Sequence, residues 1–348
     1  MKILWRKISD NHPPFVIGEV SANHKNSLKE IYRIIDCAAE IKLEAIKFQT
    51  FNVDDMTLNI SKKNFMIKKK FGIKKWNNRS LYSLYKEAQL PFEWHKNIFK
   101  RAEKKGLICF SSVFDLKSLF LLDSINCPAF KIASLESQHF PLINQVIMKK
   151  KPLIISTGTL SMYEINSLVS FLKKKKTNFA LLHCLTQYPA ELKNCNLNTI
   201  PFLKKKYQCI VGFSDHTTDS FASLAAVSLG SNIIEKHFML NDKVKTLDSQ
   251  FSFNIPKMEK LIKDTYKVWT SLGKIKNETP EVEKFYKKFR RSIYVSENIR
   301  KNEVISINNV KIIRPGFGLS PIYYDKIIGK KAKKNLYRGD PLKIKNLI

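Results

Sequence analysis

The stretch IVGFSDH at Ile210–His216 is followed by the stretch NIIEKHF at Asn232–Phe238, with a third segment, Ser220–Leu229, between them. Each outer stretch is a short apolar run that ends in polar side chains, which predicts a buried strand. The middle segment has the spacing of an amphipathic helix. A strand, a helix and a second strand in this order predict a βαβ unit of a parallel sheet.

The same pattern begins near the start of the chain. It gives eight strand candidates, which are Phe15–Ser21, Ala45–Thr50, Ile108–Phe114, Ala129–Ser134, Pro152–Gly158, Phe179–Leu185, Ile210–Asp215 and Asn232–Phe238. Eight strands alternating with helices predict an α/β fold of the closed (β/α)₈ TIM-barrel type. The alternative is a Rossmann-like sheet, which needs a glycine-rich turn after the first strand. The sequence after Gly18 is EVSANH, without a GxGxxG motif, so the barrel is favoured.

The pattern changes near residue 274. We predict a barrel domain over residues 1–274, a charged linker over residues 275–288 and a small β-rich domain over residues 289–348. The short strands predicted for the last domain are Ser292–Val295, Val310–Arg314 and Pro341–Ile344, with glycines between them.

Composition limits the class of protein. The chain has 348 residues, 44% of them hydrophobic, with neither a run long enough to span a membrane nor a secretory leader, which predicts a cytoplasmic protein with no membrane partner. The six cysteines form no CxxC pair and are expected to be reduced. The formal charge of +31 comes mainly from scattered lysines, which favours solvated faces and no nucleic-acid partner. A basic nucleic-acid-binding protein on a decayed barrel stays an alternative.

A long connection follows the second predicted strand. It covers residues 51–92 and contains the run Lys68-Lys69-Lys70 and the aromatic residue Trp76. Connections of this length usually carry function or fold over a site, and the other interpretation is a solvated excursion.

Two lysines interrupt apolar strands. Lys47 lies in AIKF and Lys131 in FKI, and a buried ammonium group needs an anionic partner. One interpretation is a structural salt bridge to Glu19 or Glu235. The other is a pocket for a phosphate or carboxylate, which the hydroxyl residues at neighbouring strand ends would complete. These hydroxyl residues are Ser134, Ser156 and Ser214.

His216 and His237 end the last two predicted strands, which are neighbours in a closed barrel. Two imidazoles there could hold a divalent metal ion and leave coordination positions for water and substrate. The residues alone leave Mn²⁺, Mg²⁺, Co²⁺ and Fe²⁺ open. Asp248 follows closely and could support the site.

Several strand-end motifs together resemble the sialic acid synthase family. These motifs are EVSANH at Glu19–His24, AIKFQT at Ala45–Thr50, FKIAS at Phe130–Ser134, ISTG at Ile155–Gly158, GFSDHT at Gly212–Thr217 and IEKHF at Ile234–Phe238. The C-terminal segments FRRSIY at Phe289–Tyr294 and IRPGFGL at Ile313–Leu319 resemble the family's antifreeze-like (SAF) domain. The resemblance implies a transferase that condenses phosphoenolpyruvate with an amino-sugar aldehyde.

The resemblance also implies roles for matching residues. The metal, Mn²⁺ in first place and Mg²⁺ or Co²⁺ otherwise, would be held by His216 and His237. Phosphoenolpyruvate would be bound by Lys47, Lys131, Ser134, Ser156 and Ser214. Sugar binding or proton transfer would involve Glu19, Gln49, Tyr188, Glu235 and Asp248. His237 would also be a catalytic residue, and Thr186 would bind substrate. Arg314 would enter the partner subunit's barrel in a domain-swapped homodimer.

Within the family, the form SANH at Ser21–His24 and the segments LYSLYKEA at Leu81–Ala88 and PFEWH at Pro91–His95 are most similar to synthases of pseudaminic acid. The substrate implied is 2,4-diacetamido-2,4,6-trideoxy-L-altrose. The alternatives are N-acetylneuraminate and legionaminate synthases. Leu185 and Met239 stand where the family usually has threonine, so these departures flank the sugar side of the expected site.

Overall fold

The computed structural model describes residues 1–67, 76–243 and 245–348, so the run Lys68-Lys69-Lys70 lies outside the described residues. Eight parallel strands close into a barrel in the order β10-β3-β4-β5-β6-β7-β8-β9. Their bounds are Phe15–Glu19 (β3), Ala45–Thr50 (β4), Ile108–Val113 (β5), Phe130–Ile132 (β6), Leu153–Ser156 (β7), Phe179–Cys184 (β8), Ile210–Asp215 (β9) and Ile233–His237 (β10). The predicted TIM barrel is therefore confirmed.

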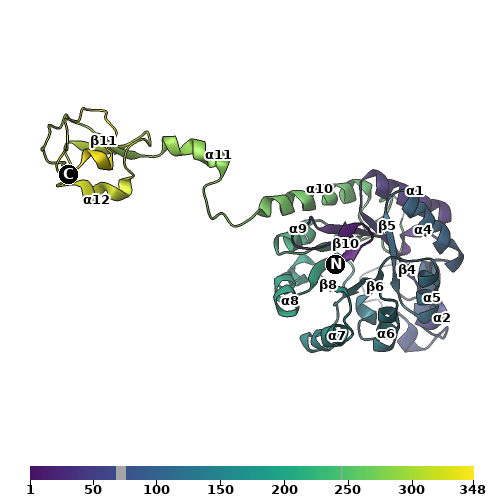
Figure 1. Cartoon of the computed structure of the whole chain (residues 1–348). Coiled ribbons are helices and arrows are strands. Elements are labelled where there is room, and N and C mark those ends of the chain that lie inside the picture. Colours follow the sequence, from purple (N-terminus) through teal and green to yellow (C-terminus); the bar gives the residue numbers. More distant parts are fainter. Residues whose placement is uncertain (68–75, 244) are drawn as a thin grey trace. The chain divides into compact units, whose positions relative to one another are not determined.

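Helices surround the strands (Figure 1). They are α1 (Leu28–Glu40), α4 (His95–Lys104), α5 (Leu116–Ser124), α6 (Phe140–Met148), α7 (Met162–Lys174), α8 (Thr199–Tyr207), α9 (Phe221–Ser228) and α10 (Ile255–Leu272). Side-chain caps fix where several of them begin. Ser161, for example, forms a capping box with Glu164 at the start of α7. Apolar faces of these helices and the buried strand residues form one continuous core.

Side chains along β10 point alternately into and out of the barrel, so neighbouring residues have different surroundings. Glu235 and His237 lie two residues apart and share the inner face, whereas Lys236 faces outward. The Lys236 Nζ atom lies 3.0 Å from Asp215 Oδ2 and donates to the Thr217 carbonyl at 2.6 Å, so its buried charge is balanced outside the barrel. Only the inner-face residues can contribute to a site in the barrel.

A short hairpin lies at the amino ends of the strands. Its strands are β1 (Lys2–Ile3) and β2 (Arg6–Lys7), and Ile3 and Ile8 are fully buried in the barrel core. The hairpin does not cover the carboxyl ends of the strands, where the loops that carry polar residues begin.

The connection after β4 folds back onto the barrel. It contains α2 (Val53–Met56) and α3 (Leu81–Ala88). Ile67 and Leu84 pack against Leu247 from the loop after β10, with Trp76 at the edge of this cluster. For the described part of residues 51–92, the interpretation as a segment that folds over the site is thus the better one.

Residues Met1–Gly273 form one compact unit, and residues Lys274–Ile348 form a second. It contains α11 (Glu281–Lys284), β11 (Ser292–Val295), β12 (Val310–Ile313) and α12 (Tyr324–Ile327) around its own small core. The predicted strand Pro341–Ile344 is wrong. Pro341 makes a single bridge to Tyr294, and after Leu342 the chain turns into a 3₁₀ helix at Ile344–Asn346.

No helix within the described residues is long and apolar enough to cross a bilayer. The predicted cytoplasmic location stays a prediction.

Candidate active site

Four buried charges meet inside the barrel near the carboxyl ends of the strands. Glu235 of β10 accepts from Lys131 of β6 at 2.8 Å and 2.9 Å, one bond to each carboxylate oxygen. Lys47 of β4 pairs with Glu19 of β3, and its Nζ atom lies 3.8 Å from Glu235 Oε2. We call these four residues the charged cluster. Both predicted salt-bridge partners are thus present, and the two positive and two negative charges balance.

Neutral side chains complete the hydrogen bonds of the charged cluster. Ser214 donates to Glu235 at 2.9 Å, and Lys47 donates to Ser112 at 2.9 Å. Gln49 donates to Glu19 at 3.0 Å and to Ser21 at 2.9 Å. Because buried charges are unfavourable unless they are paired and hydrogen-bonded, this arrangement keeps all four ionisable groups inside the barrel.

The two carboxylates differ in their electrostatic surroundings. Burial raises the pKa of Glu19 above its usual value in spite of the nearby Lys47 ammonium. Burial would raise the pKa of Glu235 as well, but Lys131 and Lys47 outweigh it and hold that pKa well below the usual range. Glu235 is therefore the permanent anion of the pair, whereas Glu19 is the carboxyl group closer to accepting a proton.

Hydroxyl groups lie close together around Gly158, just after β7. A side chain at Gly158 would place its Cβ atom 2.4 Å from Thr186 Oγ1 and 2.7 Å from Ser134 Oγ, so only glycine leaves room for both. Ser156 Oγ and Thr186 Oγ1 are buried without a hydrogen-bond partner among the described residues. Unpaired buried hydroxyls beside a buried lysine are typical of a site that binds anionic oxygens.

The two predicted metal ligands lie side by side, with ring centroids 5.5 Å apart. His216 Nδ1 donates to the Leu185 carbonyl at 2.8 Å, which leaves its Nε2 lone pair free. His237 Nδ1 is buried without a hydrogen-bond partner among the described residues and lies 3.9 Å from Asp248 Oδ2. Burial, His216 and Lys47 hold the pKa of His237 well below its usual value, so this imidazole is neutral, as a metal ligand must be.

Among the described residues, no group of three or more histidine, cysteine or acidic side chains forms a metal cage. Two histidines therefore offer an open site, in which other ligands would come from water or substrate.

Aromatic rings cover the histidine pair. Tyr188 lies over His216 with centroids 4.2 Å apart, and Phe251 lies 4.7 Å from His237. Tyr188 and Phe251 are themselves 5.0 Å apart, and Trp76 lies 6.0 Å from Tyr188. We call Trp76, Tyr188 and Phe251 the aromatic wall.

The structure brings the predicted barrel residues into one region and leaves one predicted residue elsewhere. Arg314 lies in the second unit, on an exposed segment just after β12. Three neighbours of the site were not assigned to it from the sequence: Ser112, Cys184 and Phe251. Strand register would have found Ser112, because it pairs with Gln49 on one side and Lys131 on the other.

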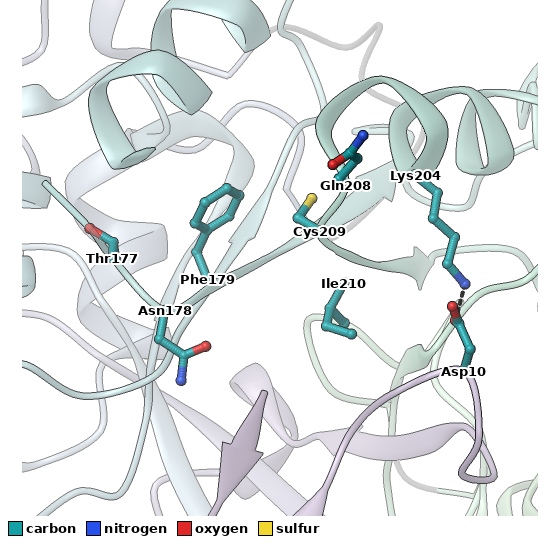
Figure 2. Close-up of a pocket in the computed structure, with 8 residues that line it drawn as sticks. All are labelled: Asp10, Thr177, Asn178, Phe179, Lys204, Gln208, Cys209 and Ile210. Atoms are coloured by element: carbon teal, nitrogen blue, oxygen red, sulfur yellow. Dashed lines mark hydrogen bonds and ion pairs between the residues drawn. The ribbon is translucent and has the colours of Figure 1, made fainter. Parts of the chain in front are cut away.

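A separate depression of about 480 Å³ lies at the other end of the barrel (Figure 2). Its lining includes Phe179 and Ile210, the first residues of β8 and β9, and the ion pair of Lys204 with Asp10. None of the residues predicted for the site lines this depression.

Two family models match the chain, one over the barrel and one over the second unit. Residues 34–277 match the NeuB family, and residues 290–348 match the SAF domain. A pseudaminic acid synthase from Campylobacter jejuni (serotype O:23/36, strain 81-176) is 38% identical over 330 residues, which are 94% of this chain and 95% of the relative. A pseudaminic acid synthase from Helicobacter pylori is 35% identical over 336 residues, covering 95% and 96% of the two chains.

Among solved structures, an N-acetylneuraminic acid (sialic acid) synthetase from Leptospira borgpetersenii has a TM-score of 0.73 and 32% identity. The match covers 82% of this chain and 94% of that one. The predicted resemblance to sialic acid synthases is confirmed, and the chain belongs to the NeuB family, with a C-terminal SAF domain.

Proposed function

We propose that the chain is a pseudaminic acid synthase, which joins phosphoenolpyruvate to 2,4-diacetamido-2,4,6-trideoxy-L-altrose and releases phosphate. The observation that carries the proposal is the buried charged cluster beside two neighbouring histidines, in a chain that is 38% identical to such a synthase along nearly its whole length. A diacetyllegionaminic acid synthase from Campylobacter jejuni is 31% identical, which favours the first assignment. Family membership also favours an enzyme over the nucleic-acid-binding alternative.

Phosphoenolpyruvate is an anion whose binding needs fixed positive charge. Lys131 and Lys47 would supply it by exchanging contacts with Glu235 and Glu19 for contacts with the substrate, and Ser134, Ser156 and Ser214 would add hydroxyl groups at neighbouring strand ends. In the reaction, C3 of phosphoenolpyruvate bonds to the aldehyde carbon, water adds at C2, and the C–O bond to phosphate breaks. Fixed lysines stabilise the negative charge throughout without reorganising.

A divalent metal ion fits the histidine pair, because the hydrogen bond of His216 Nδ1 leaves its Nε2 atom as an acceptor and the buried His237 Nδ1 has no hydrogen-bond partner among the described residues. We propose that His216 and His237 hold this ion, with Mn²⁺ the first choice and Mg²⁺ or Co²⁺ the alternatives. When bound, such an ion polarises a carbonyl group as a Lewis acid. Asp248 Oδ2, 3.9 Å from His237 Nδ1, would add negative charge beside such an ion.

Proton transfer falls to Glu19. Its pKa is raised by burial, whereas that of Glu235 is lowered by two lysines, so Glu19 is the one of these two carboxylates that more readily takes up a proton. We therefore assign Glu235 the task of positioning Lys131. We assign Gln49, Tyr188 and Asp248 to the sugar, since Tyr188 lies over His216 and Asp248 lies 3.9 Å from His237, and we assign Thr186 to the anion, since it lies with Ser134 at Gly158.

We propose that Arg314 of the second unit reaches the site of a partner subunit in a domain-swapped homodimer. A guanidinium group there would hydrogen-bond carbonyl or hydroxyl oxygens of the sugar.

The proposal is tested with purified protein, phosphoenolpyruvate, Mn²⁺ and one of three sugars: the diacetamido-trideoxy altrose, the legionaminate precursor or N-acetylmannosamine. We expect phosphate release with the first sugar, its loss on chelation, and its return on adding metal. Turnover with N-acetylmannosamine alone would refute the proposed substrate. Activity that survives chelation and both His216→Ala and His237→Ala would refute the metal site.

A further inference from the structure

The outermost ring of the aromatic wall belongs to Trp76, in the connection between β4 and α3. Phe251 is buried, Tyr188 is half-buried, and Trp76 is half-buried at the edge of the cluster formed by Ile67, Leu84 and Leu247. The wall therefore extends from the histidine pair to the outer part of the site.

Trp76 is held in place from two sides. Its indole Nε1 donates to the Leu247 carbonyl at 3.2 Å, directly beside Asp248. Two residues on, Asn78 donates to the Ile67 carbonyl at 2.9 Å, and Ile67 donates to the Arg79 carbonyl at 2.8 Å. The indole is thus tied to the loop after β10 and its backbone to Ile67, with the ring centroid 6.0 Å from that of Tyr188.

The site thus has two regions of different chemistry. The charged cluster suits the anionic substrate, and the histidine pair suits the aldehyde carbon. Asp248 lies on one side of His237, and the aromatic wall offers ring faces on the other side of the pair, where hydroxyl groups of a sugar would find few hydrogen-bond partners. A sugar bound with its aldehyde at the histidines must place its distal carbons along this wall.

We propose that Trp76 determines sugar specificity, because its ring contacts the methyl groups of a sugar that carries two acetamido groups and a terminal deoxy carbon. A hexosamine with free hydroxyls in the distal positions would lose water there without gaining hydrogen bonds. This inference rests on the proposed function and adds a residue that separates diacetamido-trideoxy sugars from N-acetylmannosamine. One methyl-sized contact in an apolar pocket changes specificity by about 10- to 200-fold.

The test compares wild-type protein with Trp76→Ala and Trp76→Phe. For Trp76→Ala we expect the KM of the diacetamido-trideoxy sugar to rise by about 30-fold, which lies within the range for such contacts. The inhibition constant of N-acetylmannosamine should change by less than about threefold, since that sugar does not use the contact. The KM of phosphoenolpyruvate should stay within about twofold, because the charged cluster is untouched.

Trp76→Phe keeps a ring against Tyr188 but removes the bond to Leu247, so a small rise in sugar KM, about fivefold or less, is expected if ring contact is what matters. Trp5→Ala, which removes an exposed tryptophan from the hairpin at the amino ends of the strands, is the matched control and should change neither constant. Thermal unfolding midpoints verify that all variants fold.

The proposal fails if Trp76→Ala leaves sugar KM unchanged, or if it weakens both sugars and phosphoenolpyruvate by one common factor, as a merely structural residue would. If the wild-type protein does not turn over the diacetamido-trideoxy sugar at all, it is the proposed function that fails, which separates the two results.

Discussion

Lys131 and Glu235 form a pair with two short hydrogen bonds, 2.8 Å and 2.9 Å long, inside the barrel. Lys131→Met should lower kcat/KM for phosphoenolpyruvate by at least about 100-fold, because fixed charge that stabilises an anionic transition state is usually worth that much. The measurement is phosphate release against phosphoenolpyruvate concentration.

Lys204→Met is the matched control, since Lys204 also forms an ion pair, with Asp10, but lies at the opposite end of the barrel. It should leave kcat/KM within about twofold. Equal losses in both variants would mean that Lys131 acts through stability alone.

Glu19 sets a pH dependence whose sign follows from its raised pKa. Because burial moves this pKa above the usual 4.5, the carboxylate form appears only at higher pH than for an exposed glutamate. If the carboxylate is the active form, kcat should fall on the acid side with an apparent pKa above 4.5, and Glu19→Gln should abolish this acid limb in its residual activity.

Glu235→Gln provides the contrast. Its own pKa lies well below the usual range, so the acid limb should persist in the remaining activity of this variant. An acid limb that vanishes in Glu235→Gln and persists in Glu19→Gln would reverse the two assignments.

At this scale, the sequence predicted which residue types would meet but not how they would pair. Lysines inside apolar strands required anions, and two glutamates were candidates. That Glu235 bridges both lysines depends on side-chain rotamers and on the stagger of the strands, which a strand pattern does not contain. Cys184 and Phe251 were missed because an apolar or thiol side chain at a strand or loop end has the same pattern as core packing.

At the scale of elements, the ends of β6, β7 and β8 meet at Gly158. Gly158→Ala would place a methyl group within 2.7 Å of both Ser134 Oγ and Thr186 Oγ1, so these side chains must move. We expect the KM of phosphoenolpyruvate to rise by about tenfold or more, since the hydroxyls are displaced from the anion site.

Ser134→Ala removes one of the two clashing atoms, so the double variant Ser134→Ala with Gly158→Ala should lose less than the product of the two single effects. Strictly multiplicative losses would show that the two residues do not share one site.

Element positions were predicted more closely than element roles. The predicted bounds of the eight barrel strands agree with the observed bounds to within about two residues, because buried apolar runs of this kind are distinctive. The departure from the family at Leu185 has little consequence in the structure, since this residue orients His216 through its backbone carbonyl, which any residue supplies. The connection after β4 could not be interpreted from the sequence alone, because the contact of Trp76 with Tyr188 joins residues more than a hundred positions apart.

For the whole molecule, the chain divides into two units, each with its own core. The charged cluster and the histidines lie in the first unit, and Arg314 lies in the second. Sequence composition indicated this division near residue 274, because the helical periodicity stops there and glycine-separated short strands begin. Composition does not indicate whether the second unit of one chain contributes Arg314 to its own barrel or to the barrel of a partner chain.

Mixing two inactive variants distinguishes the possibilities. His216→Ala should lack the metal site, and Arg314→Ala should lack the sugar contact, so each homodimer should be inactive. In a domain-swapped heterodimer, the intact barrel of the Arg314→Ala chain receives Arg314 from its partner and regains activity. Random re-association makes about half of the dimers mixed, with one of two sites intact, so activity should return to about a quarter of the wild-type value. If Arg314 serves the barrel of its own chain, mixing restores nothing, and if it serves no barrel, the Arg314→Ala protein is active before mixing. Phosphate release before and after co-refolding distinguishes these outcomes.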